Sequence, residues 1–262
     1  MQWFNHNLKD RSYSNTYDFK LSFNQSKAFN LPFHQACLDF ASKLYDEHKD
    51  LVVSYSGGLD SEYILKLLSE LGITYKTAIL KTEFNPIEFE YAEKYCTSNG
   101  IKFDVIELNA HQFFEKMYYK TYDKGLYSML GGVPAIVHDY YGGKVITGNA
   151  PPFYHPTEES MRLPLPSTLE FCEWDFYEYD GNVIQFFNHD ANVMHSMVVE
   201  TDFGLPMQYA KAKLYGLEYR PKLYYTDRFY AINNGLRPFD FEYNQLIERD
   251  EFLKIFTPTD ML

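Results

Sequence analysis

The stretch that decides the fold is "VVSYSGGLDSEYILKLLSEL", residues 52–71. Together with Leu51, its first residues form a short apolar run that is typical of a buried strand. After Asp60 the apolar residues recur at helical spacing, and Gly72 predicts where that helix ends. The two serines, two glycines and one aspartate between these patterns therefore form a turn that leads directly from a strand into a helix.

The same alternation continues after this turn. We expect strands in "ITYKTAIL" (73–80), "IKFDVIEL" (101–108) and "KVITGN" (144–149), and helices in "PIEFEYAEKYCTSNG" (86–100), "AHQFFEKMYYKTYD" (110–123) and "VPAIVHDYY" (133–141). Strands that alternate with helices of this length predict a parallel sheet with right-handed crossovers. The expected fold class is α/β, with a doubly wound parallel sheet built by residues 51–150.

The flanking segments have a different character. In residues 1–50, "YDFKLSFNQSKAF" alternates polar and aromatic positions as a strand or hairpin does, and Pro32 opens a helical stretch. We expect this part to be a strand-helix lead-in that packs on the core. Residues 151–262 begin with a proline-rich run, then show a turn at Asp180-Gly181 between two strand-like pieces, and two helical stretches. This pattern predicts an irregular α+β extension, which we expect to contact a substrate or a partner.

Composition limits the classes of function. The chain has 262 residues, of which 45% are hydrophobic, so it can bury a sizeable core. No apolar run approaches the ~20 residues of a membrane span, and the start lacks the layout of a secretion signal, so we expect a cytoplasmic protein with no membrane partner. The net charge of −12 argues against a broad surface that binds nucleic acid. A local basic patch on an otherwise acidic protein is still compatible with this charge.

The Ser-Gly-Gly corner suits an anion. Ligands of parallel sheets bind beyond the carboxyl ends of the strands, where a strand-to-helix turn presents backbone N–H groups and the positive end of the helix dipole. Gly57 and Gly58 permit a close approach, Ser56 and Ser61 add hydroxyl donors, and Asp60 can cap the helix or hold a metal ion that a polyphosphate brings. Neither G-x-x-x-x-G-K-[ST] nor G-x-G-x-x-G matches this corner.

"SGGLDS" resembles the pyrophosphate-binding loop of the PP-loop ATP pyrophosphatase superfamily, whose fold is of the adenine nucleotide alpha hydrolase-like (HUP) type. The resemblance covers about residues 51–149. It implies that ATP is cleaved between the α and β phosphates, that AMP passes to an oxygen of the substrate, and that a nucleophile then displaces AMP. It also implies ATP and Mg²⁺ as cofactors, with Asp60 as the metal ligand.

The resemblance carries over to particular residues. The residues that it assigns to pyrophosphate are Ser56, Gly57, Gly58, Leu59, Asp60 and Ser61. By their positions at strand ends, those that it assigns to adenosine are Ser54, Tyr55, Leu80, Gly148 and Asn149. Asp60, Ser61 and Lys81 are the catalytic candidates. Lys81 either neutralises phosphate charge or ends a strand in solvent, and Arg220 and Lys222 either reach the β and γ phosphates or an anionic substrate, or belong to a solvated face.

The expected function is that of an ATP-dependent, AMP-forming synthetase that adenylates a small-molecule or nucleobase acceptor. The alternatives are a non-catalytic ATP- or AMP-binding module and a sulfonucleotide reductase-like protein. Many relatives carry an acidic residue after the later Thr-Gly, whereas this chain reads "TGNAPPFYH", which leaves a metal or substrate role there open. Residue 2 is Gln and not the N-terminal cysteine that fused glutaminase domains use, so we expect ammonia to be free or to come from a donor protein. A sulfur donor protein is the other possible partner. The acceptor, the nucleophile and a homo-oligomeric state stay open.

Overall fold

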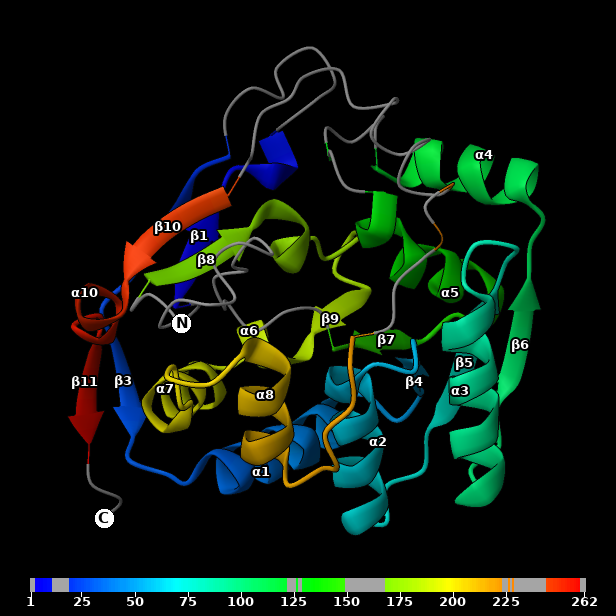
Figure 1. The fold of residues 1–262 in the computed structure, drawn as a ribbon. Helices are drawn as coiled ribbons and strands as arrows, with labels where there is room; N and C mark the ends of the chain where they lie inside the picture. The colour runs from blue at the N-terminus through cyan, green and yellow to red at the C-terminus, as the bar shows by residue number, and fades with distance from the viewer. Residues whose placement is uncertain are drawn as a thin grey trace.

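The computed structural model of the protein describes residues 3–10, 19–121, 126, 129–148, 168–222, 226, 228 and 244–259 (Figure 1). Its centre is a five-stranded sheet in the order β6-β5-β4-β7-β9, in which all neighbours pair in parallel. The five strands are β4 (Leu51–Ser54), β5 (Lys76–Lys81), β6 (Asp104–Glu107), β7 (Lys144–Thr147) and β9 (Val183–Gln185). The α/β class and the parallel sheet expected from the sequence are confirmed.

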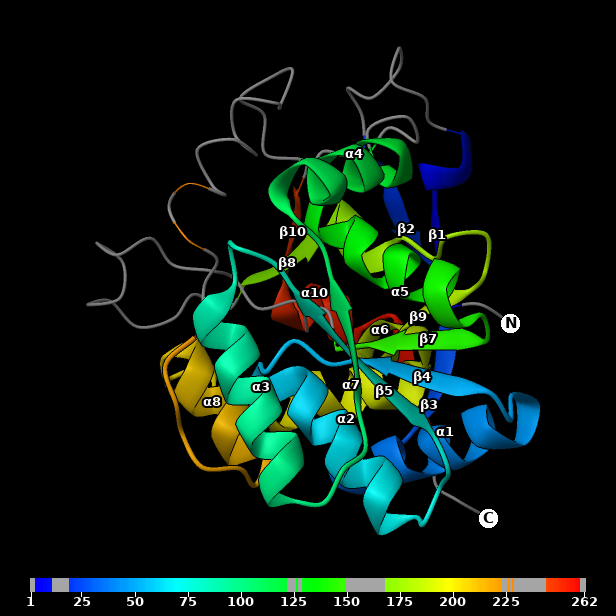
Figure 2. The same ribbon diagram turned by 90° about the vertical axis from the view of Figure 1, so that its right-hand side faces the viewer.

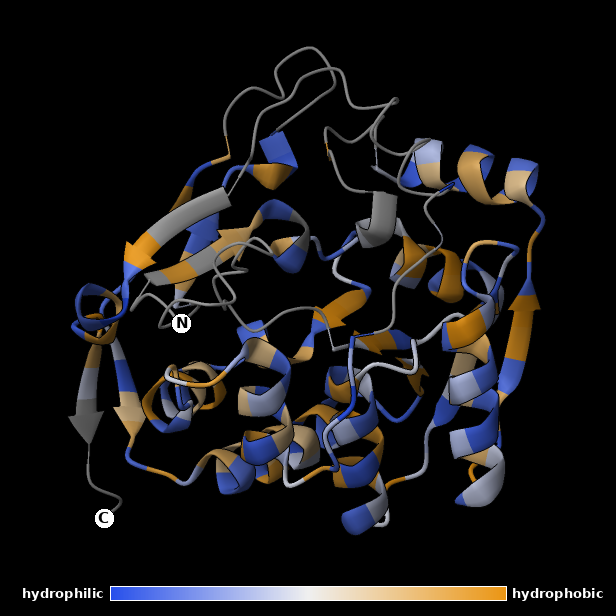
Figure 3. Ribbon diagram, viewed as in Figure 1, coloured by the Kyte–Doolittle hydropathy of each residue, from blue (hydrophilic) through white to orange (hydrophobic). Residues whose placement is uncertain are grey.

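Helices cover both faces of this sheet (Figure 2). On one face lie α1 (Phe33–Glu47), α2 (Leu59–Glu70) and α3 (Pro86–Ser98), and on the other α4 (Ala110–Thr121) and α5 (Val133–Tyr141). The side chains of β4 explain the two layers, since Leu51 and Val53 pack with α1 and α2 whereas Val52 packs with α4 and α5. The doubly wound arrangement is thus confirmed, and hydrophobic residues, drawn in orange, lie in strands β6, β7 and β9 of the sheet (Figure 3).

Two strands begin three residues later than their apolar patterns predict, β5 at Lys76 and β6 at Asp104. The residues before them finish the preceding helices. Gly72 and Gly100 both have positive φ, and the N–H groups of Ile73 and Ile101 donate to helix carbonyls five residues earlier, each over 2.9 Å. These hydrogen bonds form the C-terminal cap of a helix that ends in glycine. Because Ile73 and Ile101 belong to the caps, each strand begins only after the first residues of its apolar run.

The remaining strands pair outside the central sheet. β1 (Phe4–His6) pairs with β2 (Leu21–Phe23) and β8 (Thr168–Cys172) pairs with β10 (Asn244–Glu248), both antiparallel, while β11 (Phe256–Thr259) pairs in parallel with β3 (Ser26–Phe29). The two strand-like pieces around Asp180-Gly181 are β8 and β9, which take different partners. The division of the chain at residue 150 stays a prediction, and the sheet takes its fifth strand from beyond it.

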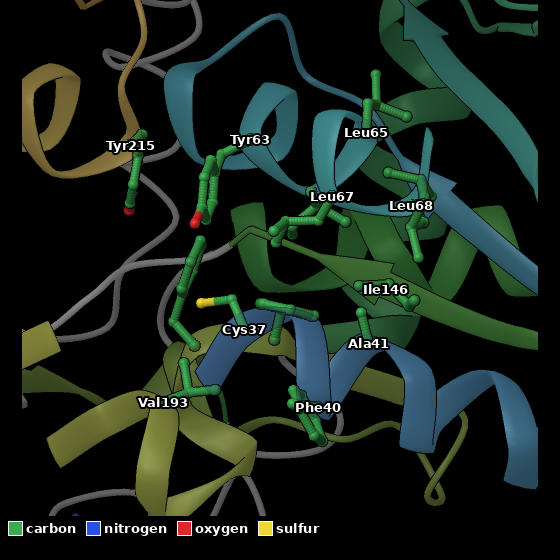
Figure 4. Close-up of a cluster of buried hydrophobic side chains, with 14 of the residues drawn as sticks. Cys37, Phe40, Ala41, Tyr63, Leu65, Leu67, Leu68, Ile146, Val193 and Tyr215 are labelled. Carbon is green, nitrogen blue, oxygen red and sulfur yellow. The ribbon is translucent and has the colours of Figure 1, made fainter. Parts of the chain in front are cut away.

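The later helices are α6 (Phe186–His189), α7 (Ala191–Glu200), α8 (Met207–Tyr215) and α10 (Arg249–Leu253). Helix α8 lies beside α2 (Figure 1). Tyr215 at the end of α8 stacks on Tyr63 of α2 with ring centroids 4.6 Å apart, and both rings are buried in the main core cluster (Figure 4). This stack fixes α8 against the first turns of α2. In the described part of the chain, no helix is long and apolar enough to cross a membrane.

Candidate functional site

The loop after β4 lies near the middle of the carboxyl edge of the sheet, because β5 and β7 flank β4 on its two sides. This is the point where the strand order reverses, the place at which open α/β sheets bind ligands. Helix α2 begins directly after the loop, with Gly58 as its N-cap residue. Glycine has no side chain that could cap the first N–H groups of the helix, so that end of the helix is suited to an anion.

Two serine hydroxyl groups hold the loop in shape. The Oγ atoms of Ser56 and Ser61 lie 3.2 Å apart. Ser56 Oγ accepts the Gly58 N–H over 3.3 Å, and Ser61 Oγ donates to the Gly58 carbonyl over 3.2 Å. The hydroxyl groups that the resemblance assigns to pyrophosphate thus lie side by side at the start of α2, with Ser56 exposed and Ser61 buried.

Two glycines of the site allow close backbone approaches. Gly57 has φ +78°, and a Cβ atom there would lie 2.9 Å from the Glu88 carbonyl oxygen of α3. A Cβ atom on Gly148, which follows β7, would lie 2.6 Å from the Ser61 nitrogen in the first turn of α2. Gly148 is therefore beside the loop, as the resemblance implies, while Asn149 lies outside the described residues.

Asp60 is engaged by helix α8. Its Oδ2 atom lies 2.7 Å from Lys211 Nζ, and its Oδ1 atom accepts a hydrogen bond of 2.6 Å from the Tyr215 hydroxyl. Lys211 and Tyr215 are four residues apart, so they share one face of α8. Burial raises the pKa of Tyr215, and so does the adjacent Asp60 carboxylate, which keeps the hydroxyl a donor. No local pattern in the sequence pairs either residue with Asp60.

This arrangement does not fit the expected Mg²⁺ ion. Both oxygens of Asp60 already have partners, one of them a cation. Among the residues that the structure describes, no group of three or more His, Cys, Asp and Glu side chains could hold a metal. The donor set around Asp60 therefore does not support a metal held by the protein.

Arg220 contacts the backbone of the loop. Its Nη2 atom donates to the Gly57 carbonyl over 2.7 Å and lies 2.9 Å from Glu62 Oε2, and its guanidinium stacks over the Tyr91 ring at 4.2 Å. Glu62 is only 5% exposed and also accepts hydrogen bonds from the hydroxyls of Tyr55 and Tyr91. In place of a phosphate contact, the structure gives Arg220 a buried ion pair that fixes the Gly57 peptide.

The other two candidate cations differ in their surroundings. Lys81 Nζ lies 2.9 Å from Glu107 Oε1 on the neighbouring strand β6, so its charge is already paired at the sheet edge. Lys222 is exposed, but desolvation of its ammonium group by the surrounding protein lowers its pKa, and the positive charge of Lys211 lowers the pKa further. The carboxylates of Asp60 and Glu88 oppose this shift. Lys222 therefore shares the electrostatic environment of the loop.

A pocket of about 310 Å³, part of it open solvent, lies beside the loop. The ends of β4 and β5 and the first turn of α3 line it, with residues Ser54, Tyr55, Ser56, Ile79, Leu80, Asn85, Glu88 and Phe89, together with Val133. Four residues expected at the nucleotide, Ser54, Tyr55, Ser56 and Leu80, thus meet at one pocket. Tyr55 is 1% exposed, and its hydroxyl group donates a hydrogen bond to Glu62.

Glu88 is a pocket residue that the sequence analysis missed. Burial raises its pKa from the ordinary 4.5 to about 7, against the opposing charge of Lys222. No local motif marks it, because its position depends on how α3 packs against the loop. Its carboxyl group is the titratable group that this pocket would present near neutral pH.

The raised pKa of Glu88 predicts a pH dependence of stability. The folded state binds this proton more tightly than the unfolded chain, so the contribution to stability is complete below pH 4.5 and is lost as the pH rises through about 7. Each pKa unit corresponds to about 1.4 kcal/mol, and water at the pocket mouth reduces the effect. In denaturant titrations between pH 5 and 8, we expect Glu88→Gln to gain about 1–2 kcal/mol on the wild type. Parallel pH profiles of the two proteins would contradict this assignment.

No family model and no curated protein matches this chain. Among solved structures, an ammonia-dependent NAD synthetase from Campylobacter jejuni matches at 18% identity and a TM-score of 0.34, over 44% of this chain and 54% of its own. The NMN synthetase from Francisella tularensis matches at 15% identity and 0.36, over 73% and 88%. A predicted tRNA methyltransferase subunit from Methanocaldococcus jannaschii matches at 16% and 0.34, over 66% and 92%.

The chain thus spans about half the length of the NAD synthetase that it matches. At these identities and scores the likeness is partial. It gives this chain no activity and no substrate.

Proposed function

We propose that this protein binds ATP at the loop of residues 56–61 and forms AMP and pyrophosphate by adenylating a small-molecule or nucleobase acceptor. The observation that carries the proposal is the loop itself, which joins β4 to α2 where the strand order reverses and opens beside a pocket at the ends of β4 and β5. The apolar side chains of Ile79, Leu80, Phe89 and Val133 suit the faces of a purine base.

The chemistry needs charge stabilisation and positioning more than a covalent group of the protein. An oxygen of the acceptor attacks the α phosphorus, the bond to the β-phosphate oxygen breaks, and pyrophosphate leaves with the negative charge. The first N–H groups of α2, the positive end of its dipole and the hydroxyls of Ser56 and Ser61 are suited to receive that charge. Ammonia, an amine or a sulfur donor would then displace AMP from the acceptor.

The test is nucleotide chromatography of the protein incubated with ATP and pooled metabolites, nucleobases and tRNA. We expect AMP and pyrophosphate in equal amounts from at least one pool, and at least a tenfold lower rate for the double variant Ser56→Ala/Ser61→Ala, since lost donors to a developing anion cost about 10²–10³ in rate. The matched control is Ser69→Ala, on the same helix and bonded to the Tyr75 hydroxyl. Formation of ADP in place of AMP would exclude this reaction.

One observation favours a second candidate, a non-catalytic ATP- or AMP-binding module. Asp60 and Glu62, both in the first turn of α2, are held in ion pairs with Lys211 and Arg220. Ion pairs that stabilise the loop suit a protein that binds nucleotide without turning it over. Calorimetric binding of ATP together with no AMP from any pool would favour this candidate.

A further inference from the structure

We propose that Glu88 selects the base of the nucleotide, because its carboxyl group binds the edge of adenine that carries the N1 atom and the 6-amino group. The ligand class is an adenine nucleoside, either free or as part of ATP. Glu88 is then a specificity-determining residue beside the loop of residues 56–61. The inference rests on the proposed function for the presence of ATP at this site.

The apolar lining of the pocket suits a flat ring. Ile79 and Leu80 at the end of β5, Phe89 of α3 and Val133 of α5 supply this lining. Apolar surface of this kind binds the faces of a purine but does not distinguish one purine from another, because purines differ in the polar groups at their edges. Selection among purines therefore depends on a polar side chain of the pocket.

Most polar side chains of the pocket are already engaged. The Asn85 amide group accepts from a backbone N–H and donates to a backbone carbonyl, each over 2.8 Å. The Tyr55 hydroxyl donates to a buried carboxylate, and the Ser56 hydroxyl accepts a backbone N–H of the loop. Among the lining residues that the structure describes, the polar side chains left for a ligand are those of Ser54 and Glu88.

The carboxyl group of Glu88 differs from the others in its surroundings. In the described part of the chain, no hydrogen bond or ion pair engages it, and the protein around it desolvates it. A desolvated polar group without a partner costs free energy, and a ligand that forms hydrogen bonds with it removes that cost. The Glu88 carbonyl oxygen lies against Gly57, so this residue belongs to the pocket and also to the surroundings of the loop.

The charges near Glu88 leave its protonated form available. Burial raises the pKa of Glu88 to about 7, and the positive charge of Lys222 opposes this shift only in part. The other charged side chains of the loop, of α2 and of the end of β5 are held in ion pairs, Asp60 with Lys211, Glu62 with Arg220 and Lys81 with Glu107. A neutral carboxyl group therefore exists at this pocket near neutral pH.

A neutral carboxyl group has one O–H donor and one carbonyl acceptor. Adenine presents the complementary pair at one edge, with N1 as acceptor and the 6-amino group as donor. Guanine presents two donors at the corresponding edge, N1–H and the 2-amino group. An ionised carboxylate only accepts hydrogen bonds, so it suits guanine instead. Protonated Glu88 thus selects adenine, and ionisation of Glu88 weakens this selection.

The experiment measures binding of adenosine by calorimetry at pH 6 and pH 8, since adenosine carries no phosphate that titrates in this range. For a pKa of about 7, the protonated fraction of Glu88 falls about tenfold between these pH values, and we expect the wild-type affinity to fall by the same factor. Glu88→Gln carries a donor and an acceptor in one amide group at every pH, so its affinity should change less than twofold. Equal changes in the two proteins would overturn the proposal.

Two controls separate recognition of the base from an effect of charge. Glu90→Gln removes a carboxylate from an exposed position two residues further along α3, and it should show the same tenfold fall as the wild type. Inorganic pyrophosphate has no base, so its affinity should change with pH in the same way in the wild type and in Glu88→Gln. A tenfold extra fall for pyrophosphate in the wild type, with none for adenosine, would show that Glu88 acts on the phosphates through its charge and would overturn the proposal.

The preference between bases is a second readout. We expect the wild type at pH 6 to bind adenosine at least tenfold more tightly than guanosine, because the wrong base leaves the carboxyl group without its hydrogen bonds. Glu88→Met keeps the length of the side chain without its polar end, and it should bind the two nucleosides within about threefold of each other. Melting temperatures check that both Glu88 variants fold. A tenfold preference that persists in folded Glu88→Met would overturn the proposal.

The two proposals fail in different ways. AMP formation from ATP, together with a wild-type adenosine affinity that is equal at the two pH values, would leave the proposed function standing and refute the role of Glu88. Adenosine selection that depends on Glu88, without AMP from any pool, would support the role of Glu88 and count against the synthetase. No binding of ATP or adenosine to the wild type would refute both.

Discussion

Replacing Arg220 with methionine is expected to lower the free energy of unfolding by about 2–4 kcal/mol, because removing one member of a buried ion pair leaves the other charge without compensation. The charge left behind is Glu62, whose side chain is 6% exposed. The hydroxyls of Tyr55 and Tyr91 still donate to it, which places the effect below the full cost of an isolated buried carboxylate. Denaturant titration of the purified variant measures this difference.

The matched control is Arg228→Met. Arg228 also pairs with a carboxylate over 2.8 Å, that of Glu83, but its side chain is 65% exposed. Exposed pairs contribute about 0–1 kcal/mol, so this variant should unfold almost as the wild type does. Equal stabilities of Arg220→Met and Arg228→Met would show that the buried ion pair between Arg220 and Glu62 does not stabilise the fold more than an exposed pair does.

A double variant separates stability from loop geometry. Arg220→Met/Glu62→Gln removes both charges of this buried pair and should regain most of the lost stability. It still lacks the guanidinium that donates to the Gly57 carbonyl. We therefore expect it to fold but to bind pyrophosphate at least tenfold more weakly than the wild type, because the Gly57 peptide is no longer fixed. Full affinity would mean that Arg220 acts only on stability.

Gly57→Ala is expected to weaken the binding of pyrophosphate. An L-residue in the left-handed conformation costs about 1–2 kcal/mol. The added Cβ atom would also lie 2.9 Å from the Glu88 carbonyl oxygen, so either the loop or α3 must move. We expect pyrophosphate affinity, measured by calorimetry, to fall at least tenfold in a protein that still folds.

The control for this substitution is Gly72→Ala. Gly72 also has positive φ, at +64°, but no atom lies within 4 Å of the added Cβ atom. The variant therefore has a similar backbone strain without the collision at α3. Gly57→Ala should lose at least as much stability as Gly72→Ala, and only Gly57→Ala should lose affinity. Equal affinities in the two would show that the contact with α3 does not shape the site.

The parts of the site that could be predicted from the sequence depend on local patterns. The change from a strand pattern to a helix pattern at Ser56–Ser61 indicates the loop, and the carboxyl ends of parallel strands share one edge. That rule brings Ser54 and Leu80 to the same pocket, 26 residues apart in the chain.

The other parts depend on tertiary packing. Lys211 reaches Asp60 because Tyr215 stacks on Tyr63, and no periodicity in the sequence relates these residues. Strand β9 has only three residues, and its parallel pairing with β7 skips β8. Glu88 becomes a pocket residue through the approach of α3 to Gly57. A sequence pattern reports the preferences of one segment and is silent about its distant partners.

The contacts of Lys211 and Arg220 mean that "SGGLDS" is not a self-sufficient element of the chain. A fragment that ended at residue 150 would contain the whole loop but would lack the counter-ions of both Asp60 and Glu62. The shortest chain from β4 that keeps both ion pairs extends to residue 220. Transplanting the loop into another strand-helix scaffold would therefore transfer its amino-acid sequence without the cations that pair with Asp60 and Glu62. The transferable unit is the loop together with the segment from α8 to Arg220.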